Sequence, residues 1–308
     1  MTRTLNAYKG LTARNAKVFL KDKMTIFFSL LTQIIVLGLF LLFIKNSYAN
    51  GIESALGALK DKVSSADIDA LLNSWMISGV IGTSVVTATM NALSVVVSDK
   101  ESKVDFDYNA SSVKGSVVVT SYFSAAVLCS LITSFILLTA GLIFLSVTGA
   151  LLLTFTDILL LYGLVVLGSV SAAVILMLII SFFKKNSTFS SFSIVISTLV
   201  GFIVGAYFPI SELGETMQSV VNLIPGAQIT ALIRGVLITP AVERINTALG
   251  GLDQGQFKEA ANQLFGLRPH IFGAEVDTGF MLLYSVTVIA VFIVLNIVLF
   301  RLSSRRKA

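Results

Sequence analysis

Six long stretches without a single Asp, Glu, Lys, Arg or His constrain the fold of this chain more than any other feature. An α-helix needs about 20 apolar residues to cross the hydrocarbon core of a bilayer, where every backbone polar group must be bonded within the protein. The sequence therefore predicts an all-α integral membrane protein with six transmembrane helices. The uncharged stretches are residues 25–44, 77–97, 117–147, 158–183, 189–208 and 280–300.

The scarcity of charge supports this interpretation and excludes two other classes of protein. Only 13% of the 308 residues are charged, against about 25% in soluble domains. Disordered chains combine low hydrophobicity with high charge, whereas 55% of these residues are hydrophobic. We divide the chain into a connecting segment 1–24, a membrane domain 25–300 and a basic tail 301–308.

The loop charges predict the orientation. With both termini in the cytoplasm, the segments on that side hold 15 Lys and Arg and 5 Asp and Glu, and the outer segments hold 7 and 12. An excess of Lys and Arg inside is the positive-inside rule. The basic composition thus follows from the topology of a multi-pass membrane protein, and it requires no nucleic-acid partner. We expect the protein in the cell (plasma) membrane.

A cleaved signal peptide is the alternative for the first apolar stretch, because Ser47 and Ala49 could form a cleavage site. The basic head of 23 residues and the apolar run of 20 are both too long for a typical signal. A retained first span is therefore the favoured interpretation.

The connecting segment 1–24 is amphipathic. Leu5, Tyr8 and Leu11 recur at helical spacing, while Arg14 and Lys17 fall mostly away from them. We expect a helix in the cytoplasmic interface, with its apolar side towards the lipid and its cations near anionic head groups. It is either a topology anchor or a lever that joins the first span to a cytoplasmic partner.

The loop 98–116 is the one sizeable cytoplasmic loop. A mixed charge run is by default a solvated turn, but charges of both signs beside aromatic residues could also dock in the groove of a partner. The residues of a docking site would be Asp99, Glu101, Lys103, Asp105 and Phe106, together with Arg14 and Lys17.

The outer segment 209–279 holds all four prolines of the chain. The stretches 210–224 and 226–239 are too short to cross a membrane, so we expect a re-entrant hairpin of two short helices. A proline would start or stop each of these helices. The remainder, 241–279, is polar and contains His270, expected in a surface loop.

Trp75, at the outer end of the second span, is typical of an interfacial anchor.

Catalytic and metal-binding chemistry is not predicted. With one His and one Cys, the sequence offers no two-His or imidazole–thiol site, and it lacks a phosphate loop. No predicted span carries an ionisable residue of the kind that usually binds a driving ion, although serine, threonine and backbone carbonyls can bind sodium. The energy for any transport is therefore expected from another polypeptide.

Two kinds of neutral residue in the spans predict contacts. Gln33 and Asn296 should face protein, because lipid offers an amide no partner. Gly201 and Gly205 have the GxxxG spacing that permits close helix approach.

Several features together resemble the permease subunits of type-2 ABC exporters, over essentially the whole chain. These features are six spans, cytoplasmic termini, an amphipathic head containing RNAKVFLKDK (14–23), and a hairpin before the last span. The most specific match is residues 205–238, with a Gly and an aromatic before Pro, an Asn-x-x-Pro, and an Arg nine residues further on. The matching residues are Gly205, Phe208, Pro209, Asn222, Pro225 and Arg234.

The resemblance implies partners and roles. Two permeases, identical or different, and two copies of a cytoplasmic ABC ATPase would form the transporter, with ATP and magnesium on the ATPase and no cofactor on this chain. A coupling helix between spans two and three would receive the motion of the ATPase. A re-entrant gate would include Pro209, Asn222, Pro225 and Arg234. The interface between the two permeases would include Gln33, Gly201 and Gly205.

The resulting prediction is a non-catalytic permease that moves an amphipathic or hydrophobic substrate outward: a peptide, a drug-like compound, a lipid or a lipid-linked glycan. A path lined by hydroxyls and aliphatic groups without fixed charge favours such molecules over small ions. A stand-alone channel or carrier and a non-transporting regulatory protein are the alternatives.

Overall fold

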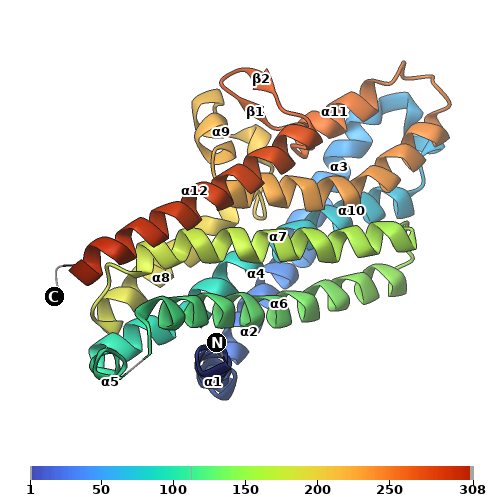
Figure 1. Cartoon of the computed structure of the whole chain (residues 1–308). Helices are drawn as coiled ribbons and strands as arrows, with labels where there is room; N and C mark the ends of the chain where they lie inside the picture. Colours follow the sequence, from blue (N-terminus) through green and yellow to red (C-terminus); the bar gives the residue numbers. More distant parts are fainter. Residues whose placement is uncertain (1, 112, 306–308) are drawn as a thin grey trace.

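The computed structural model describes residues 2–111 and 113–305, and these are almost entirely helical (Figure 1). In chain order the elements are α1 (Thr2–Lys21), α2 (Lys23–Leu39), the π-helical turn η1 (Phe40–Ile44), α3 (Lys45–Leu56), the 3₁₀ turn η2 (Gly57–Lys62), α4 (Ser65–Glu101), α5 (Val104–Ala110), α6 (Gly115–Val147), α7 (Phe155–Ile180), α8 (Asn186–Ile203), the 3₁₀ turn η3 (Ile210–Glu212), α9 (Glu215–Asn222), α10 (Pro225–Leu249), α11 (Gln256–Leu264), β1 (His270–Ile271), β2 (Ala274–Glu275) and α12 (Thr278–Arg305).

Six helical segments in the described part of the chain are long and apolar enough to cross a membrane, and each overlaps one predicted stretch. The bent pair α9–α10 would be a seventh if it were one span. The segments are Lys23–Lys62, Ser65–Glu101, Gly115–Val147, Phe155–Ile180, Asn186–Ile203 and Thr278–Leu299. An all-α membrane fold is therefore confirmed.

The long helices run roughly side by side, while α1 and α5 lie across them and are seen nearly end-on in Figure 1. We call the end of the bundle that carries α5 and the C terminus the α5 end, and the end that carries α11 the α11 end. The central helix is α4, which packs against α2, α6, α7, α8 and α10. It is the most buried of the six candidate spans.

Polar side chains join α4 to α2 and α6, and α12 to α7. Thr83 on α4 donates to Gln33 of α2 at 2.8 Å, and Thr89 donates to Ser130 of α6 at 2.9 Å. Asn296 of α12 donates to the carbonyl of Val174 on α7 at 2.8 Å. Hydrogen bonds between helices stabilise packing where apolar contacts alone give little preference over lipid. The prediction that Gln33 and Asn296 face protein is thus confirmed.

Trp75 is not an interfacial anchor, and that expectation was wrong. Its side chain is only 1% exposed and packs edge-on against Phe40 and Tyr48, with Phe265 tilted against it. Aromatic residues near the end of an apolar stretch suit a lipid interface and a protein core equally well by composition. Here α3, α10 and α11 fold over the α11 end of α4 and bury its ring.

Pro240 also departs from the expectation that prolines delimit the short helices. Pro225 does start α10, but α10 continues through Pro240 to Leu249. A proline inside a helix removes one hydrogen bond and kinks the axis, and burial of Ala241, Val242 and Ile245 just beyond it keeps the helix in place. Part of the segment 241–279 is therefore core, although its sequence reads as polar.

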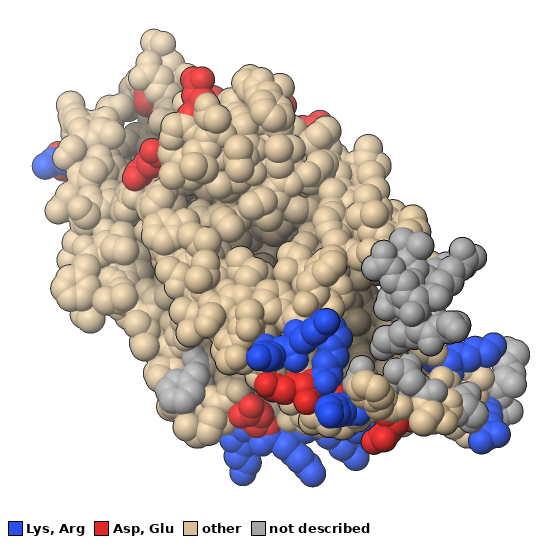
Figure 2. All heavy atoms as spheres, turned by 90° about the vertical axis from the view of Figure 1, so that its left-hand side faces the viewer, with Lys and Arg blue, Asp and Glu red and all other residues tan. Residues whose placement is uncertain are grey.

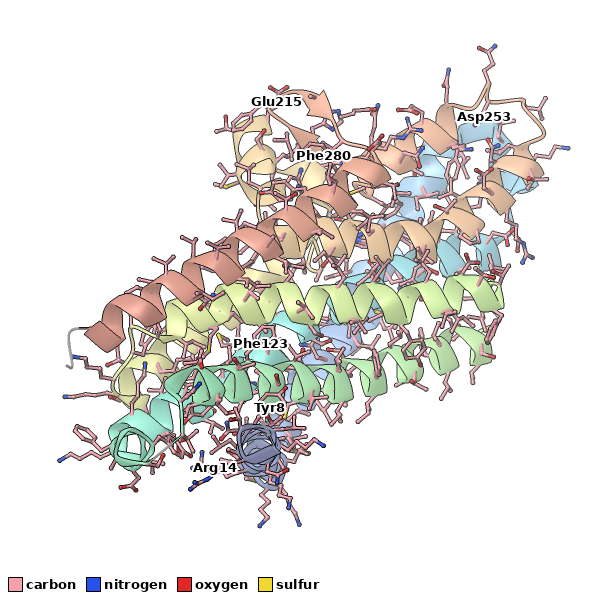
Figure 3. The ribbon with its side chains drawn as sticks, in the orientation of Figure 1. Tyr8, Arg14, Phe123, Glu215, Asp253 and Phe280 are labelled. Atoms are coloured by element: carbon pink, nitrogen blue, oxygen red, sulfur yellow. The ribbon has the colours of Figure 1, made fainter. Side chains whose placement is uncertain are left out.

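The connecting helix α1 uses its apolar side against protein. Tyr8 donates to Ser124 of α6 at 2.7 Å, Asn15 donates to Ser121 at 3.3 Å, and Phe19 is 3% exposed. Figure 3 shows Tyr8 between α1 and α6. The part of the apolar side that includes Tyr8 and Phe19 therefore packs on the bundle, where we expected lipid, while Leu5 and Val18 stay exposed.

Candidate functional site

The predicted loop 98–116 is mostly helical, and its first residues belong to α4. That helix ends at Glu101, and Lys103 then adopts a left-handed conformation (φ 62°) that starts α5 directly. Figure 2 looks onto the α5 end and shows charged residues of both signs gathered at its lower edge, below a mostly uncharged surface. A short helix thus projects from the end of the central span, in a charged region.

Asp99 is not a solvated loop residue, as the default interpretation of the charge run expected. Its side chain is buried and accepts hydrogen bonds from Arg14 of α1, one of them 2.7 Å long from Nη2, and from the Tyr122 hydroxyl of α6. A buried carboxylate needs such partners. The hydrogen bond to Asp99 raises the pKa of Arg14 above its ordinary value. The pair fastens α1 to α4 and α6.

The next two residues hold the turn between α7 and α8. The Lys100 ammonium donates to the carbonyls of Ser181 (2.7 Å) and Phe183 (3.4 Å) at the end of α7. The Glu101 carboxylate accepts the backbone N–H of Asn186 at 3.0 Å, the first residue of α8. A cation at a helix C terminus and an anion at an N terminus both suit the helix dipole.

Other predicted docking residues remain accessible. Lys103 and Lys17 are exposed, and the Phe106 side chain on α5 is 64% exposed. Burial raises the pKa of Tyr108, which lies on the same short helix. The side chain of Asp105 lies outside the described residues. Three of the predicted residues, Asp99, Glu101 and Arg14, thus bond within the chain, and three others face outward.

Arg234, predicted at a gate, is fully buried near the α11 end. Its guanidinium donates to the carbonyls of Val204 (2.6 Å) and Gly205 (3.1 Å) after α8, to that of Phe265 (2.9 Å) after α11, and to the Ser78 hydroxyl (3.3 Å). All four acceptors are neutral. One side chain therefore joins α10 to α4 and to the C-terminal ends of α8 and α11.

The other predicted gate residues lie around this cluster. Asn222 ends α9 and donates to the carbonyl of His270 at 2.9 Å, and Gln228 donates to the carbonyl of Asn222 at 2.7 Å. Pro209 precedes η3, and Pro225 starts α10. The helices α9 and α10 meet at 93°. His270 pairs across the small hairpin with Glu275 at 3.6 Å.

The predicted interface residues each have a partner within the chain. Gln33 bonds to Thr83, a Cβ on Gly201 would overlap the Tyr207 ring at 2.2 Å, and Gly205 has φ +66° beside Arg234. The absence of side chains at Gly201 and Gly205 therefore leaves room for Tyr207, which follows α8, and for Arg234. The surface of α8 that stays uncovered carries both hydroxyl and aliphatic side chains. The hydroxyls are those of Ser187, Ser190, Ser191 and Thr198, and the aliphatic groups include Ile194, Val195 and Leu199.

Sequence reasoning missed Lys100, Tyr122 and the Asn186 amide. Lys100 lies between two residues that were singled out, so its position was the available signal. Tyr122 lies inside an apolar stretch, so its sequence position gave no signal.

Within the described residues, no group of three or more His, Cys, Asp or Glu is placed to hold a metal ion.

The comparison with protein families gives one match. The family model described as ABC-2 family transporter protein covers residues 64–302, from the start of α4 into α12. In the same comparisons no curated protein and no solved structure matches the chain. The match covers more than half of the chain and includes the α4–α5 junction and the Arg234 cluster. The chain therefore belongs to the ABC-2 transporter family and is a type-2 ABC transporter permease.

Proposed function

We propose that the chain is the membrane subunit of an ATP-driven exporter, that its α5 end faces the cytoplasm, and that a separate ABC ATPase binds there. The observation that carries this proposal is α5, a short helix projecting from the central span with Phe106 exposed among charged residues. An exposed aromatic residue ringed by charges is the kind of anchor that a partner groove takes up. The loop charges support the same orientation.

Two permeases and two ATPase chains would form the complete transporter. The uncovered face of α8, where hydroxyls lie beside exposed Ile194, Val195 and Leu199, supports a substrate path there. A path of hydroxyl, aliphatic and aromatic groups fits an amphipathic or hydrophobic substrate: a peptide, a drug-like compound, a lipid or a lipid-linked glycan. The re-entrant pair α9–α10 would lie at the outer end of this path, in the cell membrane.

Co-purification tests the partner directly. The permease, tagged at its C terminus, is expressed with candidate ABC ATPases of its own cell, and bound ATPase is measured. We expect one ATPase to co-purify and Phe106→Ala to reduce its recovery strongly. Phe272→Ala, which removes an even more exposed aromatic side chain (78% exposed) from the β1–β2 hairpin, is the matched control and should have no effect.

Flux measurements separate this proposal from the alternatives. Proteoliposomes that hold the permease with its ATPase should accumulate an amphipathic fluorescent dye only when ATP is supplied. Dye flux through the permease alone, without ATP or ATPase, would instead establish a channel or carrier. Failure of every ATPase to bind would favour a regulatory protein.

A further inference from the structure

Three consecutive residues at the end of α4 each hold a different part of the α5 end. Asp99 binds Arg14 of α1, Lys100 binds two carbonyls just after α7, and Glu101 binds the first amide of α8. We propose that residues 99–101 form a joint that passes the movement of α5 to α8, with Glu101 holding the α8 N terminus through the backbone N–H of Asn186. This inference rests on the proposed function and names how that site transmits motion.

The link from α5 to the joint is short. Only Ser102 and Lys103 separate the two helices, and both backbone amides bond back to α4, to the carbonyls of Ser98 (3.0 Å) and Lys100 (3.3 Å). The amide of Phe106 then bonds to the carbonyl of Lys103 at 3.0 Å. A displacement of α5 is therefore carried into the end of α4 with little slack.

The link from the joint to α8 has the chemistry of a helix cap supplied by another helix. The first amides of a helix have no partner within it, and Lys185, which precedes α8, makes no side-chain cap. Glu101 bonds one of these amides and places negative charge at the positive end of the helix dipole. The contact thus fixes the end of the span whose uncovered face carries the hydroxyls.

The Glu101 contact can be removed from either side. Glu101→Ala removes the acceptor. Asn186→Pro removes the donor, and it suits the position because proline is favoured as the first residue of a helix. Lys185 has the extended conformation (φ −127°, ψ 134°) that a residue before proline requires. Asn186→Ala changes the same side chain but keeps the N–H, so it is the matched control.

The readout is a cysteine placed on α8, with no need for a known substrate. In a Cys129→Ser background, Ser191→Cys is labelled with N-ethylmaleimide in the permease–ATPase complex, once without nucleotide and once with ATP and vanadate. We expect the labelling rate to differ about fivefold or more between the two states, the usual size of coupling between sites. Asn186→Ala should keep this difference, and Glu101→Ala and Asn186→Pro should both abolish most of it.

Combining the two disruptive changes should add nothing to either alone, because they remove the same bond. ATPase recovery separates the possible failures. If the ATPase binds and both variants respond like the unmodified chain, the joint is refuted. If Glu101→Ala loses the ATPase, Glu101 is a docking contact and the joint is also wrong. If no ATPase binds any variant, the proposed function itself fails.

Discussion

Two arginines organise the two ends of the bundle, and they do so in opposite ways. Arg234 is fully buried and binds three backbone carbonyls and one hydroxyl. Arg14 is about one-third exposed and binds a carboxylate, Asp99, at the edge of the bundle. The first arrangement cannot open without leaving several buried polar groups unpaired, whereas water can replace the second more easily. We therefore expect a rigid α11 end and an α5 end that opens more easily.

The largest expected effect comes from Arg234→Met. The change leaves the carbonyls of Val204, Gly205 and Phe265 without their donor, and each buried unsatisfied group costs about 1–3 kcal/mol. We expect a total loss of roughly 3–5 kcal/mol, seen as a fall in the melting temperature in detergent. Arg268→Met, at an exposed arginine 3.9 Å from Glu275, should change it little. Equal effects of the two changes would show that the buried contacts of Arg234 add no stability, and would remove the evidence for a rigid α11 end.

Asp99→Asn should have an intermediate effect. It weakens the charge-assisted bonds that fasten α1, which are worth about 1.5–3 kcal/mol, but Arg14 can turn towards solvent. We therefore expect α1 to loosen while the rest of the bundle stays folded. Limited trypsin digestion should cleave faster at Lys17 and Lys21, and a global fall in melting temperature as large as that of Arg234→Met would contradict the comparison.

Lys103→Gly should change the stability still less. A left-handed conformation costs a non-glycine residue about 1–2 kcal/mol, and glycine avoids this cost but loses more entropy on folding. The melting temperature should stay nearly constant while the junction between α4 and α5 becomes softer. A reduced nucleotide response of the α8 cysteine at unchanged stability would sharpen the comparison. An unchanged response would show that the backbone at Lys103 does not contribute to stiffness.

Low pH should have the smallest of these effects on the difference in stability between the two ends. Hydrogen bonds from Thr25 lower the pKa of Asp22, which caps α2 beside α1. Because the folded pKa lies below the ordinary value, this stabilisation is present above about pH 4 and is lost as the pH falls further. Asp22→Ala should cost about 1 kcal/mol at neutral pH and less in acid. The acceptors of Arg234 do not titrate, so melting of Asp22→Ala and Asp22→Asn against pH should isolate the carboxylate.

The sequence predicted the parts of this fold that depend on composition. Uncharged stretches located all six candidate spans, and the cost of amides in lipid explained why Gln33 and Asn296 face protein. The sequence could not show that Asp99 is buried, because its partner Arg14 lies 85 residues away. For the same reason it could not show that Trp75 is enclosed by α3 and α11. Partners brought together by tertiary packing leave no local pattern.

The candidate site was predicted in the same uneven way. The charge run with Phe106 marked the α4–α5 junction, since charges and aromatics rarely gather in so short a loop by chance. The sequence did not show which charged residues bond within the chain and which face solvent. A carboxylate that caps another helix and one that faces solvent are the same residue type. Gly201 in α8 and Gly205 just after it were assigned to an interface with a second permease, and their spacing could not show that Tyr207 and Arg234 of the same chain lie beside them.

Hydrogen exchange of the permease–ATPase complex tests most directly whether the α5 end moves and the α11 end stays rigid. Amide exchange is measured without nucleotide and with ATP and vanadate. We predict that exchange rates change in α1, α5 and the first turn of α8, and that those of α10 and α11 around Arg234 stay the same. Changes confined to α10 and α11, with α5 and the start of α8 unaffected, would contradict the account.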